Sequence, residues 1–228
     1  MKLTLNPGQN VWFCSDPHYN HKNICRGVSK WSQDNYQYFL DATRDYPDLE
    51  TMNHRLVEAM NEAEENDIIF CLGDWSFGGF ASIWQFRKQI KCKNIYLILG
   101  NHDHYIERNG IFEHEDNHPG LRDWFNLQSN IKVHDLFTWV GHYLEVQINK
   151  QTFVLCHYPI SSWNGLNKGW IHLHGHIHSQ KLGPGKTMDV GFDSNSKFSM
   201  YSLTDVMDIM NKQSIQSNLT EDHHERDF

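Results

Sequence analysis

The stretch HLHGHIHS, residues 172–179, places four histidines at alternate positions around a single glycine. Alternate residues of an extended chain share one face, so these side chains point in a common direction. A hydrophobic core has little use for four imidazoles, and a surface in contact with water gains nothing from strict alternation. The stretch therefore indicates a strand whose end delivers histidines to a binding site.

The same order, an apolar run followed by polar side chains, recurs along the chain. Four runs of four or five residues are apolar on both faces, as in strands that are covered on both sides of a sheet. They occupy residues 11–14, 68–72, 95–99 and 152–156. The polar residues that follow these runs or end the histidine stretch are Asp16, His18, Asp74, Asn101, His102, Asp103, His157, His176 and His178. Loops converge at the carboxyl ends of such strands, so we expect these side chains to meet.

The kinds of side chain at these strand ends indicate which metal ions could bind there and which reaction they would support. Two aspartates, one asparagine amide oxygen and several histidines, with no thiolate, suit Mn²⁺, Fe or Zn²⁺ in five- or six-coordinate sites. Seven candidate ligands are too many for one ion but fit two ions that share a carboxylate. Such a pair of ions clamps a phosphoryl group and activates a water molecule. The residues alone therefore predict a dinuclear hydrolase.

The remaining segments alternate between helical and strand patterns. Residues 48–65 carry apolar side chains at spacings of three and four, which predicts an amphipathic helix, and residues 81–90 show a weaker helical pattern. Further elements are expected as strands at 143–148, 188–192 and 198–202 and as a closing helix at 203–210. This order predicts a layered α/β fold in one domain, residues 1–212, and a polar, disordered tail at 213–228.

The composition excludes several classes of protein. The chain of 228 residues has a formal net charge of −8 and no segment rich in Lys and Arg, which argues against long nucleic acids as partners. No apolar run approaches the ~20 residues that a transmembrane helix needs, so we expect no membrane partner. The five cysteines form no C-x-x-C pair, and the amino terminus has no apolar signal-peptide core. We therefore expect reduced thiols and a cytoplasmic location.

Taken in order, these motifs resemble the motif series of the calcineurin-like metallophosphoesterases. The matching blocks are Asp16-x-His18, Gly73-Asp74, Gly100-Asn101-His102-Asp103, His157 and Gly175-His176-x-His178. The segments SDPHYNHKNI, at 15–24, and MDVGF, at 188–192, are similar to those of the small bacterial and phage-type members. The resemblance implies a four-layer α-β-β-α sandwich with a dinuclear metal site at the carboxyl ends of the strands. Residues 27–49 and 105–139 have no counterpart in it.

The resemblance also implies which residues hold each of two divalent ions. The first ion would be bound by Asp16, His18, Asp74 and His178, and the second by Asp74, Asn101, His157 and His176, with Asp74 bridging the two. Mn²⁺ is the expected metal, with Fe, Zn²⁺ and Ni²⁺ as alternatives. His172 and His174 have the same parity as the ligands but lie further back in the strand, so we expect them to line the sheet or support the ligands.

Catalytic and substrate-binding roles follow from the same resemblance. His102 would be the general acid that protonates the leaving oxygen, a task that suits an imidazole because its ordinary pKa is about 6.5. Asp103 would either orient that imidazole or cap the following turn. His21 and Asn23 would border the substrate pocket, and Arg26 is the nearest cation to bind a phosphate oxygen.

The resemblance favours a phosphodiesterase over a protein phosphatase. Protein phosphatases of the superfamily follow the Gly-Asp block with a further Asp and Arg that grip a phosphomonoester, whereas this chain reads GDWSFG at 73–78. We expect a phosphodiesterase that acts on nucleotide-like or other small diesters, with a hydroxide that bridges the two ions as nucleophile. The alternatives are a broad-scope phosphomonoesterase, then a nuclease, and then a binding module without catalytic activity, which the complete ligand set disfavours.

Overall fold

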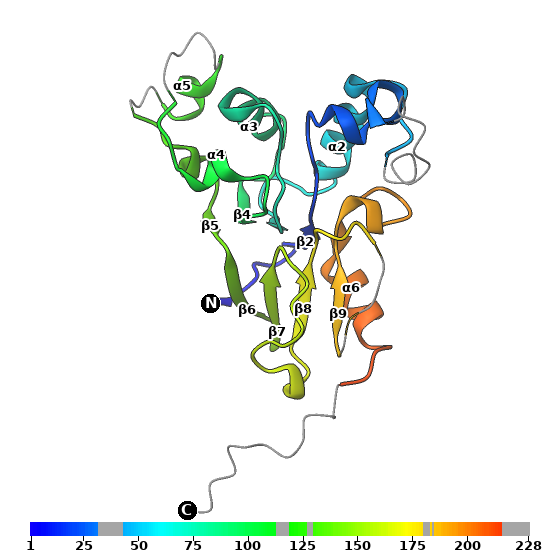
Figure 1. Cartoon of the computed structure of the whole chain (residues 1–228). Coiled ribbons are helices and arrows are strands. Elements are labelled where there is room, and N and C mark those ends of the chain that lie inside the picture. Colours follow the sequence, from blue (N-terminus) through cyan, green and yellow to red (C-terminus); the bar gives the residue numbers. More distant parts are fainter. Residues whose placement is uncertain (32–42, 113–118, 127–129, 180–182, 184, 216–228) are drawn as a thin grey trace, which may run out of the picture.

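Two five-stranded sheets organise the computed structural model of the chain, which describes residues 1–31, 43–112, 119–126, 130–179, 183 and 185–215 (Figure 1). Sheet A contains, in spatial order, β1 (Lys2–Leu3), β6 (Tyr143–Ile148), β7 (Gln151–Cys156), β8 (Ile171–His174) and β9 (Thr187–Asp189). Sheet B contains β10 (Tyr201–Ser202), β2 (Val11–Cys14), β3 (Ile68–Cys71), β4 (Asn94–Ile98) and β5 (Trp139–Gly141). Neighbouring strands are parallel except for the β6–β7 hairpin and the β10–β2 pair.

The two sheets face each other across a core built by the alternation of side chains along the strands. In β3, Phe70 faces sheet A, whereas Cys71, the next residue, faces the helices on the other side. The ring of Phe13 lies 5.5 Å from that of Phe70 and 5.4 Å from that of Phe153, measured between centroids. Phe153 belongs to β7, so sheet A and sheet B are in direct contact. Burial of each such ring contributes about 1.5–3 kcal/mol to stability.

Helices α2 (Leu49–Met60) and α3 (Gly79–Arg87) cover the outer face of sheet B. Asp48 starts α2 because its carboxylate accepts a hydrogen bond, 2.7 Å long, from the backbone amide of Thr51. The apolar stripe predicted from the sequence packs against the sheet. Its buried members include Met52, Leu56, Ala59, Met60 and Ala63.

The predicted helix at 48–65 is shorter than expected because its end is tied to the chain that follows α3. The side-chain amide of Asn61 donates to the carbonyl of Gln89 (2.9 Å) and accepts from the amide of Lys91 (2.8 Å). These bonds turn the chain toward β3 immediately after Met60.

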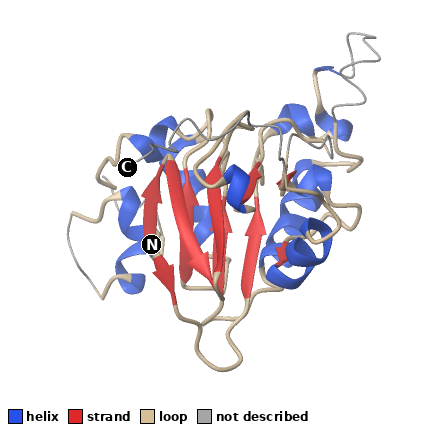
Figure 2. Ribbon diagram, turned by 90° about the horizontal axis from the view of Figure 1, so that it is seen from below, coloured by secondary structure: helices blue, strands red, loops and turns tan. Residues whose placement is uncertain are grey.

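The outer face of sheet A carries less regular structure. Val154 of β7 packs there against Trp163 and Leu166, in a loop that includes the single-turn helix η6 (Leu166–Lys168). The closing helix, α6 (Leu203–Met210), has the predicted bounds, and its Val206 joins the core between the sheets. Figure 2 shows the strands in the middle of the molecule, with helices to either side.

The strands expected at 188–192 and 198–202 are shorter than predicted because side chains bind the adjacent backbone. The Asp189 carboxylate accepts a hydrogen bond from the backbone amide two residues later (2.6 Å), which ends β9. The side-chain amide of Asn195 donates to the carbonyl of Ser199 (2.8 Å), and β10 begins only after this turn.

Single-turn helices and two edge strands complete the fold. The helices are η1 (Lys22–Ile24), η2 (Arg26–Val28), α4 (His104–Glu107), α5 (Leu121–Trp124), η5 (Val133–Leu136) and η7 (Phe192–Ser194). The edge strands β1 and β5 have two and three residues, and the sequence pattern did not predict them. Of the tail predicted at 213–228, residues 216–228 lie outside the described residues, so the single domain and its tail remain predictions.

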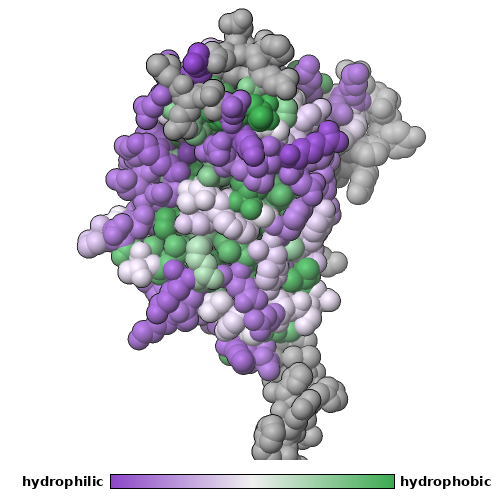
Figure 3. Space-filling model, turned by 90° about the vertical axis from the view of Figure 1, so that its left-hand side faces the viewer, coloured by the Kyte–Doolittle hydropathy of each residue, from purple (hydrophilic) through white to green (hydrophobic). Residues whose placement is uncertain are grey.

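Polar residues dominate the face of the molecule in Figure 3, and hydrophobic groups form smaller patches among them. Within the described ranges, every helix is too short or too polar to traverse a bilayer.

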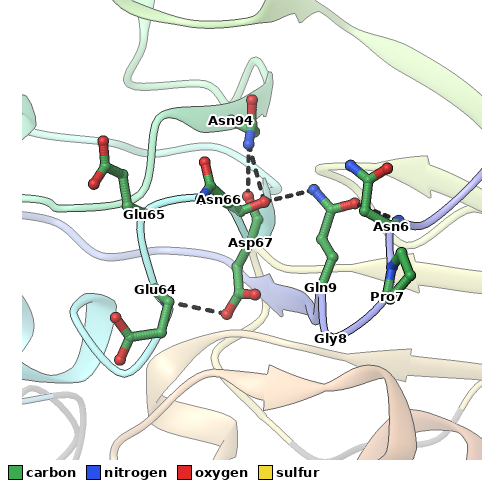
Figure 4. A pocket seen from close by; sticks show the side chains of 9 residues that line it. All are labelled: Asn6, Pro7, Gly8, Gln9, Glu64, Glu65, Asn66, Asp67 and Asn94. Carbon is green, nitrogen blue, oxygen red and sulfur yellow. Dashed lines mark hydrogen bonds between the residues drawn. The ribbon is translucent and has the colours of Figure 1, made fainter.

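A cavity of about 770 Å³ opens at the amino ends of β2, β3 and β4, the opposite end of sheet B from the predicted ligands (Figure 4). Asp67 lies in its wall. The Asp67 carboxylate accepts hydrogen bonds from the amide of Asn10 (2.8 Å), the indole of Trp12 (3.0 Å) and the amide of Glu64 (3.0 Å). Burial opposes the charge of Asp67, but these three donors outweigh it and hold its pKa below the usual range.

Asp67→Asn is predicted to lower the free energy of unfolding by about 1–3 kcal/mol at pH 7, because the amide presents N–H groups to donors that need an acceptor. The lowered pKa in the folded state means that the charged carboxylate stabilises the fold fully above its unfolded pKa of about 3.9, and that this stabilisation is lost progressively as the pH falls from there through the lower folded-state pKa. Urea unfolding at pH 7 and pH 3 should therefore show a smaller difference between variant and wild type at pH 3. Asp208→Asn, at an exposed position of α6, is the control. A difference independent of pH would contradict the account.

Candidate metal centre

The seven predicted metal ligands lie where the carboxyl ends of the two sheets meet. Asp16 and His18 follow β2, Asp74 follows β3 and Asn101 follows β4, all in sheet B, whereas His157 follows β7 and His176 and His178 follow β8, in sheet A. The predicted strand-end pattern thus brings ligands from both sheets to one place.

A first group of donor atoms surrounds Nε2 of His18. This atom lies 3.2 Å from Nε2 of His178, 3.6 Å from Oδ1 of Asp16 and 3.7 Å from Oδ2 of Asp74. Nε2 of His178 lies 3.5 Å from the same Asp16 oxygen. Nitrogen and oxygen ligands lie about 2.0–2.2 Å from a metal ion, so ligand atoms on one ion are roughly 3–4 Å apart. The spacing of this group fits one ion.

A second group adjoins the first through Asp74. Oδ2 of Asp74 lies 3.6 Å from Nε2 of His157. Oδ1 of Asn101 lies 3.0 Å from that nitrogen and 2.9 Å from Nδ1 of His176. One oxygen of Asp74 therefore faces both groups, as a bridging carboxylate would.

The electrostatics of the centre also fit divalent cations. Oδ1 of Asp16 is buried and makes no hydrogen bond with the part of the chain that is described. Burial raises the pKa of Asp74, and the charge of Asp16 adds to that increase. Burial also favours a higher pKa at Asp16, but the nearby His18 and His178 outweigh this effect and lower the pKa of the Asp16 carboxyl. Two buried carboxylates in this proximity, one with an unpartnered oxygen, form a site for positive charge.

The backbone is strained at the ligands. Five of the seven have left-handed φ angles: Asp16 (54°), His18 (50°), Asp74 (57°), His176 (72°) and His178 (49°). Each such residue costs about 1–3 kcal/mol, which the surrounding structure must offset. The loops are held in this conformation by hydrogen bonds, including one of 2.9 Å from the amide of His176 to Oδ2 of Asp16.

Two glycines allow the ligand loops to approach closely. A Cβ atom at Gly175 would lie 1.9 Å from Oγ of Ser15 and 2.2 Å from Oδ2 of Asp16. Gly73 has a φ of 100°, and a Cβ there would lie 2.5 Å from the backbone nitrogen of Gly100. These glycines let the β2, β3, β4 and β8 loops meet.

Asp103 was predicted either to orient the His102 ring or to cap the following turn. Its carboxylate accepts hydrogen bonds from the backbone amides of Asp74 (2.7 Å), Trp75 (2.9 Å) and Gly100 (2.9 Å). Its side chain makes no cap hydrogen bond to α4, and its role in orienting His102 stays a prediction. Burial raises the pKa of Asp103 to about 6. Asp103 is a positioning residue that joins the loops after β3 and β4.

His102 is exposed at the edge of the centre. Its backbone amide donates a hydrogen bond of 2.8 Å to Oδ1 of Asp74, which places the ring beside the ligand groups. The ring centroid lies 5.7 Å from that of His18 and 4.9 Å from that of Phe77. Partial burial among these rings lowers the pKa of His102.

A cavity of about 520 Å³ opens beside the first ligand group. Its lining residues are His18, His21, Ile24, Trp31, Thr43, His102, Ile177, His178 and Asp193. His21 stacks on Phe77 at a centroid distance of 3.8 Å, so two stacked aromatic rings lie beside the cavity. Asn23 lines a neighbouring cavity of about 590 Å³. Its side-chain oxygen accepts a hydrogen bond from the backbone amide of Lys30 (3.4 Å). The structure therefore brings His21 to the centre and leaves Asn23 at its margin.

The role of Arg26 in binding a phosphate oxygen stays a prediction, and in the structure its guanidinium contacts the chain around it. The Arg26 guanidinium donates to the side-chain oxygen of Thr43 (3.0 Å) and its carbonyl (3.1 Å), and it pairs with Asp45 (3.2 Å). The buried cation beside the ligands is instead Arg44, which the sequence did not single out. Arg44 lies in the segment 27–49, which follows no periodic pattern and has no counterpart in the motif series.

The first two histidines of the opening stretch are buried and contact backbone carbonyls in or beside sheet A. The His172 ring stacks against Trp163 at a centroid distance of 5.1 Å and contacts the carbonyl of Val154 (3.0 Å). The ring of His174, also buried, contacts the carbonyl of Gly175 (3.0 Å). Both histidines therefore belong to the packing of sheet A.

Comparison with known proteins identifies the family. A family model of calcineurin-like phosphoesterases matches residues 9–203. The chain belongs to this family. Two clusters of side chains could each hold a metal ion, Asp16 with His18 and His178, and Asp16 with Asp74 and His157. The family and these clusters together support hydrolysis of phosphate esters with the help of divalent metals.

One solved structure shares the fold at low sequence identity, and two others match most of the chain with lower scores. A protein of unknown function from Aquifex aeolicus, AQ665, has a TM-score of 0.57 and 14% identity, over 89% of this chain and 100% of its own. An archaeal phosphodiesterase has a TM-score of 0.41 and 14% identity, over 86% of this chain and 99% of its own. The phosphoesterase Yfce from E. coli has a TM-score of 0.37 and 16% identity, over 82% of this chain and 80% of its own. No curated protein matches the chain in sequence.

Removal of the shared carboxylate should impair both ligand groups. Asp74→Ala is expected to weaken Mn²⁺ binding at both groups by more than about 100-fold, whereas Asn101→Ala should weaken it at one, because a lost direct ligand costs at least as much as a lost supporting contact. Equilibrium dialysis followed by metal analysis counts the ions retained by each variant. Asp67→Asn, which alters a buried carboxylate at the far end of sheet B, is the control. Equal losses in Asp74→Ala and Asn101→Ala would refute the shared role of Asp74.

Proposed function

We propose that this member of the calcineurin-like phosphoesterase family is a dinuclear metal-dependent phosphodiesterase that acts on nucleotide-like or other small diesters. The observation that carries the proposal is the position of Asp74, which has one oxygen within 3.7 Å of His18 Nε2 and 3.6 Å of His157 Nε2. Two divalent ions, with Mn²⁺ first among the candidates, would lower the pKa of a water molecule and stabilise charge on phosphoryl oxygens.

The position of His102 supports a role in protonation of the leaving group. It lines the cavity next to the ligand groups and is exposed, so its ring nitrogens are accessible to a substrate. Its lowered pKa leaves a smaller protonated fraction at neutral pH but makes the imidazolium a stronger acid, as transfer of a proton to an alkoxide requires. The leaving alcohol would then occupy the part of the cavity bordered by His21, Ile24 and Trp31.

The charges around the cavity favour a diester over a monoester. A phosphomonoester carries up to two negative charges, and dedicated arginines bind such groups well. Among the described residues that line the cavity, none is Lys or Arg. Arg26 is occupied by Thr43 and Asp45, and Arg44 by Asp193 and backbone carbonyls. A diester, with its single charge, needs no further cation.

The same features bear on partners and location. The net charge of −8 disfavours long nucleic acids, so small phosphoesters are the proposed substrates. All five cysteines are free thiols, and four of them are buried, which agrees with a reducing compartment such as the cytoplasm.

The His102→Ala variant tests the proposal. With added Mn²⁺, the wild type should hydrolyse bis-p-nitrophenyl phosphate faster than p-nitrophenyl phosphate and should lose this activity with a chelator. His102→Ala should reduce kcat by roughly 10²–10⁴-fold for a dinucleotide, whose alkoxide leaving group needs a proton. The reduction should be smaller for bis-p-nitrophenyl phosphate, because p-nitrophenolate leaves without protonation.

The neighbouring exposed residue supplies the matched control. His104→Ala should leave both activities unchanged. An equal reduction for both substrates in His102→Ala would argue against general acid catalysis, and a faster reaction with the monoester would support a phosphomonoesterase instead.

A further inference from the structure

Asp193 is the closest partner of a metal-ligand histidine. Its Oδ2 lies 2.6 Å from Nδ1 of His178. An ionised carboxylate only accepts hydrogen bonds, so Nδ1 of His178 carries the proton that it donates. The lone pair of His178 is therefore on Nε2, the atom that lies 3.2 Å from Nε2 of His18 and 3.5 Å from Oδ1 of Asp16. Asp193 thus sets both the tautomer and the direction of this ligand.

Arg44 holds Asp193 in place. Nε of Arg44 donates to Oδ1 of Asp193 and Nη2 donates to Oδ2, each at 2.8 Å. This two-bond arrangement fixes the plane of the carboxylate, which a single contact would leave free to rotate. The Arg44 side chain is 3% exposed and that of Asp193 is 20% exposed, so most of the pair is shielded from water. The Phe198 ring, 5.0 Å from the guanidinium carbon, closes one face of the pair.

The same guanidinium reaches the loop that carries the other ligands of the first group. Nη2 of Arg44 donates to the carbonyl of Asp16 (2.6 Å), and Nη1 donates to the carbonyl of Pro17 (2.7 Å). Asp16 and His18, two positions later, both have left-handed backbone conformations. Arg44 therefore joins the loop after β2, in sheet B, to Asp193, which follows β9 in sheet A.

We propose that Arg44 and Asp193 act as a positioning pair that sets the affinity of the first ligand group for its divalent ion, an inference that rests on the proposed metal-dependent function. The pair contacts Asp16 and His178 directly and contacts none of Asn101, His157 and His176 in the hydrogen bonds of the described residues. Its effect is therefore specific to one of the two groups. Lysine cannot replace Arg44, because one ammonium cannot make two parallel bonds to Asp193 and also reach two carbonyls.

A role in folding alone makes a different prediction. If the pair only held the two sheets together, its loss would lower the stability of the metal-free protein and would weaken both ligand groups alike. A positioning role changes the affinity of the first group and leaves the second unchanged. The two groups must therefore be measured separately.

The experiment uses the full chain in two backgrounds. Asn101→Ala removes a ligand of the second group and so reports on the first, and His18→Ala reports on the second. Arg44→Lys and, independently, Asp193→Asn are introduced into each background, and Mn²⁺ binding is measured by isothermal titration calorimetry. The expected result is a 10–100-fold weaker affinity in the Asn101→Ala background, as for other contacts that support metal ligands, and no change in the His18→Ala background.

Arg87→Lys is the matched control. Arg87 is also buried, and its guanidinium donates to the carbonyls of Leu136 (2.8 Å), Ile90 (3.1 Å) and Lys93 (3.4 Å), away from the ligand groups. This variant should lower the thermal stability of the metal-free protein without a change in either affinity.

Three results would overturn the inference. Equal weakening of both groups by Arg44→Lys and Asp193→Asn would show a role in folding alone. Unchanged affinity of both groups, in variants that bind Mn²⁺ normally, would show that the pair does not position His178. If the wild type binds no Mn²⁺, the proposed function is wrong, and so is the inference that rests on it.

Discussion

Asp74 is the residue through which the two halves of the metal centre are joined. One of its oxygens faces histidines from both ligand groups, and the other accepts a hydrogen bond from the amide of His102. Its own amide donates to Asp103, and its left-handed backbone turns the carboxylate toward sheet A. Each group contains ligands from both sheets. The geometry of the site therefore depends on the packing of sheet A against sheet B, which the phenylalanine core between them maintains.

Two carboxylates outside the predicted ligand set support the ligand loops at two levels. Asp103 ties together the loops after β3 and β4 within sheet B, through three backbone amides. Asp193, with Arg44, ties a loop of sheet B to the ligand His178 of sheet A. The ligand loops combine strained backbones with close, buried negative charge, both of which oppose folding. Cations that bind only the folded state stabilise it by RT ln(1 + c/Kd), where c is the concentration of the free cation, so we expect fold stability to rise with metal concentration.

The strands were predictable from the sequence because they follow local rules. An apolar run on both faces predicted the strand at 11–14, and a hairpin pattern around a polar turn predicted the strand at 143–148. The glycines at 73, 100 and 175 marked the loops in which the predicted ligands lie together, whereas the metal-binding roles of those ligands stay predictions. Arg44 and Asp193 were not predicted as partners, because 149 positions separate them and the segment around Arg44 has no periodic pattern. The hydrogen bonds from three backbone amides to Asp103 likewise depend on tertiary packing.

If two ions are held between the sheets and share Asp74, anomalous diffraction at the manganese edge should locate both in crystals of the wild type grown with Mn²⁺. We expect two peaks about 3.5–4 Å apart, one beside His18 and His178 and the other beside His157 and His176, with Asp74 in contact with both. A single peak, or two peaks that do not share Asp74, would contradict this arrangement.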